Sequence, residues 1–354
     1  METMSHKEFQ LLLWENVFRN GIPASGIFEL TPLCNLDCRM CYVHLQDPSV
    51  KDRMMRGTEW ISIFEQAAEL GMLSAILTGG EAMTHPDFEM IYRRLCGLGV
   101  SISVKTNGIL LNGQARALYR ELPPSTVDIS VYGCDRESYL SVTGHDMFDT
   151  VDRNIRAAVK GGLPVRFMIT PTGLMKDRIE DIMRYAKSFS VKTVVNTQLL
   201  EPYDNTGRHK EDFDLSADQM IDILKKGYEL FPPEDISLEE EPGRSSEPEE
   251  KPETLRCIAG RSHFGICWDG TMVPCLNFPR ELISADVKKL GVKEAWNKIR
   301  RETADFRRPE ECRKCAYRNK CNYCPSSHGK YAVRHQCSPM ACGLEKRLID
   351  EFRS

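Results

Sequence analysis

Short apolar segments alternate with amphipathic helical segments from about residue 24 to residue 200, and this repeat limits the possible folds more than any other feature of the chain. The apolar segments are rich in β-branched residues, which is typical of buried strands. A repeated strand–helix unit predicts a parallel sheet covered by helices. Six units can be counted. Because crossover connections are right-handed, they should curl into a partial (β/α)6 barrel, an α/β fold.

The predicted strands share the same pattern and cover residues 26–31, 75–78, 102–105, 127–131, 165–169 and 193–199. The helical periodicity falls on residues 58–70, 87–97, 113–121, 148–161, 178–188 and 216–231. Barrels of this kind carry their chemistry at the carboxyl ends of the strands. Cysteine or glycine residues follow each of the first four strands, so we expect these four loops to meet at one rim.

The segment 236–254 is acidic, rich in Pro and Ser, and has almost no apolar side chain to bury. Such a composition is typical of a solvated connection. A chain of 354 residues has room for one large and one small domain. We therefore predict an N-terminal helix over 1–23, a barrel over 24–235, an acidic linker over 236–256 and a cysteine-rich domain over 257–354.

Overall charge and hydrophobicity exclude several classes of partner. The net charge of −4 gives no basic surface of the kind that binds nucleic acid. No run of about 18 apolar residues and no N-terminal signal pattern are present. We expect a cytoplasmic protein with no nucleic-acid or membrane partner.

The chain has fourteen cysteines, and in a reducing compartment these are better explained as metal ligands than as disulfides. Cys34, Cys38 and Cys41 place three thiolates within eight residues of the loop after the first strand. They can hold three corners of a cubane iron–sulfur cluster, and the missing fourth cysteine leaves one iron open. The alternative is a zinc site completed by His44.

Two motifs resemble the signature of the radical S-adenosylmethionine (SAM) superfamily. The first is CxxxCxxC followed by an aromatic residue, Tyr42, directly after the first strand. The second is Gly79-Gly80-Glu81 at the end of the second strand. The resemblance implies that SAM binds the open iron of a [4Fe–4S] cluster and is cleaved reductively. The resulting 5′-deoxyadenosyl radical would abstract a hydrogen atom from the substrate.

The same resemblance assigns further residues to SAM. The glycine turn would offer backbone carbonyls to the SAM ammonium, because glycine lets the backbone approach a ligand closely. Ser130 and Arg156 match positions that hold the SAM carboxylate, for which an arginine fork is suited. Polar side chains near the strand ends could reach the ribose. The predicted SAM-binding residues are Tyr42, Gly79, Gly80, Glu81, Asn107, Ser130, Arg156 and Gln198, with Asn196 beside Gln198.

Cys134 follows the fourth strand at the predicted rim. Epimerases of this superfamily use a cysteine as hydrogen donor to a substrate radical, and Cys134 could have that role. The alternative is a small loop residue without a catalytic function.

The C-terminal cysteines resemble those of the SPASM domain, which holds auxiliary iron–sulfur clusters. Within it, Asp269-Gly270 predicts a β-hairpin with positive φ at both turn residues. The resemblance implies two auxiliary [4Fe–4S] clusters, and a zinc ribbon is the alternative. The first cluster would be held by Cys257, Cys275 and Cys324, and the second by Cys312, Cys315, Cys321 and Cys342, while Cys267 and Cys337 are further possible ligands.

The resemblance implies a peptide or protein substrate, modified by crosslinking, thioether formation or oxidation during ribosomal peptide maturation. Polar wall candidates are Arg166, Glu201 and Asp204. Sulfatase maturases carry an acidic residue where this chain has Leu276, which lowers that option. A flavodoxin or ferredoxin would supply electrons. The alternatives are a sugar or aminoglycoside dehydrogenase or epimerase, and a non-catalytic iron–sulfur or zinc protein.

Overall fold

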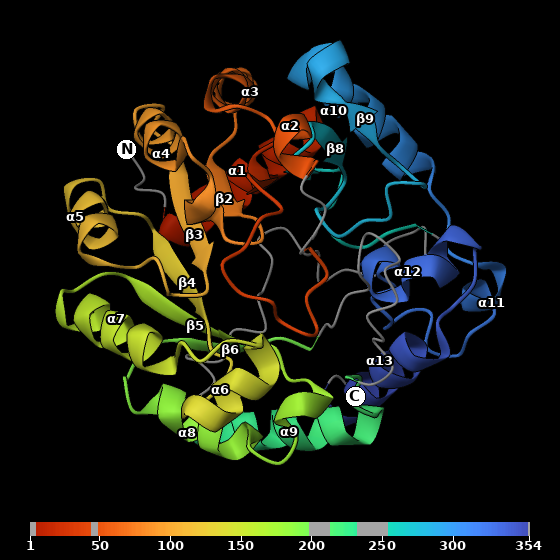
Figure 1. The fold of residues 1–354 in the computed structure, drawn as a ribbon. Helices are drawn as coiled ribbons and strands as arrows, with labels where there is room; N and C mark the ends of the chain where they lie inside the picture. The colour runs from red at the N-terminus through yellow and green to blue at the C-terminus, as the bar shows by residue number, and fades with distance from the viewer. Residues whose placement is uncertain (1–4, 44–48, 198–212, 232–253, 353–354) are drawn as a thin grey trace.

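The computed structural model describes residues 5–43, 49–197, 213–231 and 254–352 (Figure 1). Six parallel strands pair in sequence order, which confirms the predicted βα repeat and the open, partial barrel. These strands are β1 (Ser25–Glu29), β2 (Ser74–Thr78), β3 (Ser101–Thr106), β4 (Thr126–Ser130), β5 (Val165–Ile169) and β6 (Thr193–Val195).

Helices cover the outer face of this arc of strands, as Figure 1 shows. They are α3 (Gly57–Glu69), α4 (Phe88–Cys96), α5 (Gly113–Glu121), α7 (Phe148–Lys160), α8 (Ile179–Lys187) and α9 (Ala217–Leu230). Each lies within a few residues of its predicted range. Shorter helices that the periodicity did not indicate lie in the loops: α2 (Val50–Arg53), η1 (Ala82–Thr84), α6 (Arg136–Thr143) and η2 (Gly173–Met175).

Side chains of the strands alternate between the helix layer and the concave side of the sheet. In β3, Ile102 and Val104 are buried in the core, whereas Ser103 and Lys105 are half-buried on the opposite face. The hydroxyl of Thr126 on β4 donates to Ser103 Oγ at 2.9 Å across that face. The concave side, called the lumen below, is therefore lined by polar residues.

The cysteine-rich region begins on the edge of the barrel sheet. Strand β7 (His263–Ile266) pairs in parallel with β1, so that Ser25 lies opposite His263. The antiparallel strands β8 (Thr271–Val273) and β9 (Ala285–Asp286) extend the sheet further. The order in the described residues is β6-β5-β4-β3-β2-β1-β7-β8-β9. Backbone hydrogen bonds thus join the two parts of the chain.

The predicted hairpin between β7 and β8 is confirmed, but its turn differs from the expectation. Gly270 has a φ of +91°, whereas Asp269 is not in the left-handed region. The Asp269 side chain instead accepts the Thr271 N–H at 3.0 Å, which satisfies the turn with a side-chain bond.

Aromatic packing fixes the junction of the two sheet parts. The Phe28 ring on β1 makes edge contacts with the rings of Trp60 and Phe64 on α3 and of Phe264 on β7. All four side chains are buried. Such edge-to-face pairs stabilise beyond the area that they bury.

The C-terminal helices complete a ring opposite the barrel (Figure 1). Helix α13 (Pro339–Phe352) lies along α9, with Lys225 paired to Glu351 and Arg347 to Asp218, both at 2.9 Å. The other helices of this half are α10 (Val287–Asp305), α11 (Glu310–Arg313) and α12 (Pro325–Val333).

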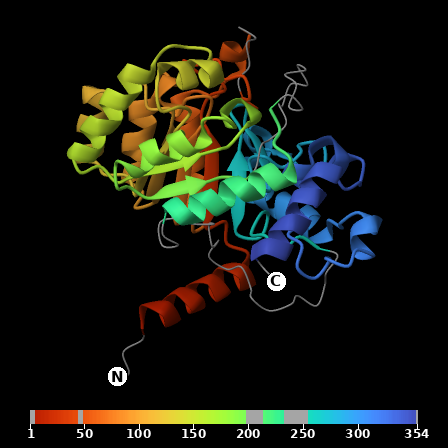
Figure 2. The ribbon, with the colours of Figure 1, turned by 90° about the horizontal axis from the view of Figure 1, so that it is seen from below.

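The N-terminal helix α1 (His6–Asn20) projects from the body of the molecule (Figure 2). Most of the predicted linker 236–256 lies outside the described residues, and the domain boundaries stay predictions. No helix among the described residues is long and apolar enough to cross a membrane.

Candidate functional site

The first three cysteines lie in the loop that leaves the carboxyl end of β1. Cys38 is buried, and Cys34 and Cys41 are half-buried. Burial, with smaller contributions from the charges of Glu81 and Cys41, raises the pKa of Cys34 to about 12, against the lowering effect of the Leu36 N–H. The Leu36 N–H donates to Cys34 Sγ at 3.4 Å. The three thiols thus share one partly closed environment, whereas His44, the zinc alternative, lies outside the described residues.

The two glycines after β2 allow two loops to touch backbone to backbone. A Cβ at Gly79 would lie 2.4 Å from the carbonyl oxygen of Thr31, and one at Gly80 would lie 2.5 Å from that of Leu33. The Gly80 N–H donates to Thr31 O at 2.8 Å. The glycines therefore hold the cysteine loop against the end of β2. This packing role of the glycines differs from the predicted one, in which the turn offers backbone carbonyls to the SAM ammonium.

Gly80→Ala is expected to displace the cysteine loop, because the added methyl group would overlap backbone rather than a flexible side chain. We expect a loss of about 1–3 kcal/mol in the free energy of unfolding, measured by chemical denaturation, and reduced iron binding at Cys34, Cys38 and Cys41. Gly113→Ala is the matched control, since a Cβ there meets nothing within 4 Å. Equal effects of the two substitutions would contradict this explanation.

Glu81 points toward the end of β3. Its buried carboxylate accepts the Thr106 hydroxyl at 2.9 Å and the Asn107 N–H at 2.8 Å. Burial raises the pKa of Glu81 to about 7, against the lowering effect of these hydrogen bonds. The side chain that was predicted to bind SAM is thus engaged in holding the end of β3.

Asn107 supports the cysteine loop with its side chain. Its amide nitrogen donates to Asn35 Oδ1 at 2.7 Å and to Cys34 Sγ at 3.6 Å, while its amide oxygen accepts the Ile109 N–H at 3.0 Å. These bonds use the groups that were predicted to reach a ribose. Gln198, the other ribose candidate, lies outside the described residues.

Two tyrosines border the three cysteines. Burial raises the pKa of Tyr132, and the charge of Cys38 raises it further. A hydrogen bond with Ser130 lowers it. Burial also raises the pKa of Tyr42, with the charges of Glu29 and Cys41 adding to the shift. The predicted residues Ser130 and Tyr42 therefore lie at the site, together with Tyr132, which the sequence analysis missed.

Glu29 is a second residue that the sequence did not single out. It ends β1 with a side chain that is 0% exposed, and Arg280 Nη2 lies 3.9 Å from its carboxylate. Burial raises its pKa to about 8, with Arg280 lowering it in part. The thiol of Cys267, also fully buried, lies nearby. A charged residue at a lumen position of a short strand was the signal that could have identified it.

Arg156 does not join the site. It lies on α7 with 60% of its side chain exposed, paired to Asp152 at 2.8 Å. Its guanidinium lies over the ring of Phe189, 4.9 Å from the centroid. Ile155, its neighbour, faces the core, so the helix turns Arg156 outward. The expected contact with the SAM carboxylate is thus not supported by the position of this residue.

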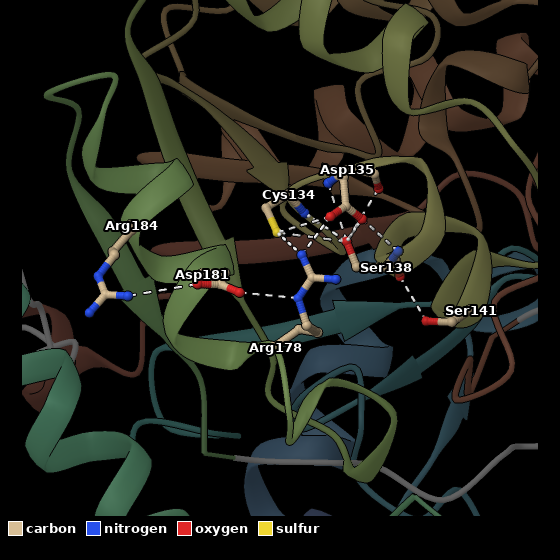
Figure 3. Close-up of polar contacts among 7 residues, drawn as sticks. All are labelled: Cys134, Asp135, Ser138, Ser141, Arg178, Asp181 and Arg184. Atoms are coloured by element: carbon tan, nitrogen blue, oxygen red, sulfur yellow. Dashed lines mark hydrogen bonds and ion pairs between the residues drawn. The ribbon is translucent and has the colours of Figure 1, made fainter.

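Cys134 lies between the start of α6 and the loop before α8 (Figure 3). Its Sγ accepts from Arg178 Nη2 at 3.4 Å, and its N–H donates to Ser138 Oγ at 3.0 Å. Arg178 also pairs with Asp135, whose pKa is lowered to about 2 by its bonds with Ser138 and then by Arg178. Cys134 also lies near Tyr185 of the outer helix α8, where its charge adds a small contribution to the raised pKa of that tyrosine, which burial causes first. Its role as hydrogen donor stays a prediction.

Several C-terminal cysteines surround a cavity of about 110 Å³ between the cysteine-rich part and the end of the barrel sheet. Cys337 Sγ lies 3.1 Å from Cys312 Sγ and 3.5 Å from His328 Nε2. Cys337, named only as a further possible ligand, therefore lies among the predicted ones. The cavity is lined in part by Cys321, Cys324, Cys337, Cys342 and His328.

Among the described side chains, no group of three or more His, Cys, Asp or Glu could hold a single metal ion as it stands. The ligand sets of the clusters stay predictions. The cysteines nevertheless fit iron–sulfur chemistry in one respect: partly buried thiol groups, one receiving N–H bonds at its sulfur, gather at two places in the fold.

Residues 28–186 match the model of the radical SAM superfamily, and residues 257–325 match SPASM, an iron–sulfur cluster-binding domain. The chain carries a radical SAM domain followed by a SPASM domain. It is a radical SAM enzyme, and its two domains imply SAM and [4Fe–4S] clusters as cofactors. The description of the second domain supports iron–sulfur clusters over the zinc-ribbon alternative. The match of the first domain to an enzyme superfamily supports catalysis over a non-catalytic metal protein.

Curated relatives carry the name probable GTP 3′,8-cyclase. The protein from Pyrococcus abyssi is 32% identical over 198 residues, which cover 55% of this chain and 64% of the relative. That from Aeropyrum pernix is 26% identical over 312 residues, covering 79% and 82%. The chain spans between 50% and 64% of the length of the first three relatives.

Solved structures show the same fold. Streptococcus suis SuiB bound to SAM has a TM-score of 0.72 at 15% identity, covering 97% of this chain and 84% of SuiB. The protein anSMEcpe with SAM has a TM-score of 0.69 at 19% identity, covering 92% and 96%. Both proteins have also been solved with peptides, SuiA and Cp18Cys respectively.

The predicted function, modification of a peptide or protein, is wrong for this chain, since the curated relatives are named for a reaction on GTP. A SPASM domain with many cysteines was the basis of that prediction. Such a domain indicates auxiliary clusters, but it does not identify the substrate. The flavodoxin or ferredoxin reductant stays a prediction.

Proposed function

We propose that this enzyme carries out a SAM-dependent radical reaction on a purine nucleoside triphosphate, of the kind that gives its relatives the name GTP 3′,8-cyclase. When bound, SAM and its cluster supply a 5′-deoxyadenosyl radical that takes a hydrogen atom from the substrate. The residues of the chain bind the nucleotide, orient it and exclude water. The names of the relatives support the nucleotide, and the charges in the lumen support an anion.

The observation that carries the proposal is a row of charged residues across three neighbouring strands. Lys105 on β3 lies opposite Asp128 on β4, and Asp128 lies opposite Arg166 on β5. All three occupy lumen positions, because Lys105 and Asp128 lie two residues from Ser103 and Thr126 on their own strands, and Arg166 lies opposite Asp128. Two cations and one carboxylate leave the row with a net positive charge.

Within the row, Lys105 supplies the positive charge that is available to a ligand. Arg166 donates to both oxygens of Asp128, at 2.9 and 2.7 Å, which fixes the guanidinium. Its side chain is 18% exposed. Lys105 is half-buried and forms no ion pair with any described residue. A held arginine beside a lysine is suited to a phosphate group.

The row lies just below the cysteine loop. Lys105 is two residues before Asn107, and Asp128 is two residues before Ser130. At about 3.3 Å per residue, this places the charges roughly 7 Å deeper in the lumen than the rim. Phosphates bound there would leave the sugar and base near Cys34, Cys38 and Cys41, where hydrogen abstraction is expected.

The test is anaerobic turnover of the reconstituted enzyme with SAM, dithionite and GTP deuterated at ribose C3′, a position named in the reaction of the relatives. We expect deuterium in 5′-deoxyadenosine and a cyclised nucleotide by mass spectrometry. ATP and a guanosine without phosphates serve as comparisons. SAM cleavage without deuterium transfer from any nucleoside triphosphate would overturn the proposal.

Lys105→Met is expected to raise the KM for GTP by about 10- to 100-fold, because a hydrogen bond to a charged group contributes about 1.5–3 kcal/mol. Lys105 forms no ion pair with a described residue, so the substitution removes the lumen cation that is available to the phosphates. Steady-state kinetics over a range of GTP concentrations measure this effect. Lys289→Met is the control, since Lys289 is 81% exposed on α10. An unchanged KM in Lys105→Met would contradict phosphate binding in the lumen.

A further inference from the structure

We propose that Asn107 raises the reduction potential of the cluster held by Cys34, Cys38 and Cys41, through an N–H···S hydrogen bond to Cys34, and that Glu81 is a positioning residue for this bond. The proposal rests on the assignment of Cys34 as a cluster ligand and is independent of the substrate.

The orientation of the Asn107 amide is fixed by its neighbours. Its oxygen accepts the Ile109 N–H at 3.0 Å, and one N–H donates to Asn35 Oδ1 at 2.7 Å. Exchanging the amide oxygen and nitrogen would place two donors or two acceptors face to face at both contacts. The nitrogen therefore faces Cys34 Sγ, at 3.6 Å.

Glu81 holds the backbone of Asn107 in place. Its carboxylate accepts the Asn107 N–H at 2.8 Å and the Thr106 hydroxyl at 2.9 Å. Thr106 in turn accepts the Gly108 N–H at 3.0 Å. Glu81 and Asn107 are 1% and 5% exposed, so these bonds form away from water, where they are stronger. The end of β3 is thus held at the distance at which the amide reaches the sulfur.

Hydrogen bonds to the sulfurs of an iron–sulfur cluster are among the main determinants of its potential. One-electron reduction adds negative charge that is shared by the thiolates, so a donor at Cys34 stabilises the reduced state more than the oxidised state. Cys34 also accepts the Leu36 N–H at 3.4 Å, and Asn107 therefore supplies one of two described donors. Cleavage of SAM needs an electron from this cluster, which links the potential to the reaction.

The experiment is an anaerobic redox titration of the reconstituted holoenzyme without nucleotide, following the electron paramagnetic resonance signal that changes when SAM is added. In Asn107→Leu we expect the reduced state to lose stability by about three- to tenfold relative to the oxidised state, the size of one hydrogen bond. Tenfold corresponds to a fall of about 59 mV for one electron.

The matched control is Asn154→Leu on α7. Its amide donates to Gly108 O at 3.0 Å and Ile109 O at 2.9 Å, and so holds the same loop without reaching the sulfur. We expect lower stability but an unchanged potential. An equal fall in both variants, or no fall in Asn107→Leu, would overturn the proposal.

Two milder variants cover the case in which Asn107→Leu binds no iron. Asn35→Ala removes the acceptor that orients the amide, and Thr106→Val removes a hydrogen bond to the Glu81 carboxylate at the end of β3 without changing any charge near the cluster. Each is expected to lower the potential by a smaller amount. An unchanged potential in both would overturn the proposal. Because no nucleotide is present, failure of the proposed GTP reaction would not affect this result.

Discussion

Replacing Cys34, Cys38 and Cys41 together with Ala is expected to abolish formation of 5′-deoxyadenosine from SAM and to remove about four irons per chain. The three residues follow β1 in one loop, and the loop after β2 packs against it at Gly79 and Gly80. Anaerobic iron analysis and chromatography of the SAM products measure both effects. SAM cleavage at the wild-type rate would contradict the assignment.

The same triple variant should retain about eight irons and the charge-transfer absorbance of iron–sulfur clusters, if the C-terminal cysteines hold two auxiliary clusters. Cys96→Ala is the control for general effects of losing a cysteine, because Cys96 lies on the outer helix α4. It should leave the iron content unchanged. Stoichiometric zinc without iron in the triple variant would contradict the auxiliary clusters.

Arg166→Met is expected to lower the free energy of unfolding by about 3–5 kcal/mol, the cost of leaving a buried charge without its partner. Asp128 is the charge left behind, since its side chain is 0% exposed and Arg166 donates to both of its oxygens. Chemical denaturation of the iron-loaded protein measures the loss.

Combining Asp128→Asn with Arg166→Met should recover most of that loss, because the double variant has no buried charge at this position. Arg184→Met serves as the surface control. Its side chain is 60% exposed and its ion pairs are expected to contribute little. A double variant no more stable than Arg166→Met would show that the loss has another cause.

The strands and helices of the barrel were predictable because each follows from local periodicity. The helix predicted over 148–161 is observed at Phe148–Lys160, and the strand predicted over 165–169 is observed at Val165–Ile169. The spacing of Cys34, Cys38 and Cys41, with two glycines after the next strand, also identified the cofactor, because both motifs are contiguous in the chain. The substrate was predicted wrongly, since no local motif encodes the shape and charge of the lumen.

The direction of individual side chains depended on contacts between distant segments. Arg156 faces the outer surface because the helix phase that buries Ile155 turns it away. The amide of Asn107 meets Asn35, 72 positions away in the chain, only because parallel strands bring the loops after β1 and β3 to one edge. A side-chain contact between two such loops cannot be predicted from the sequence of either loop alone.

The sequence by itself determined the βα repeat, the place of the cysteine loops and the chemistry of their ligands, because strand and helix periods and short motifs are local properties. Only the tertiary structure decided that β7 pairs with β1, 238 residues apart at Ser25 and His263. It also decided that Lys105, Asp128 and Arg166 form one charged row. Strand pairing and register follow from which faces are buried together, and that is a property of the whole fold.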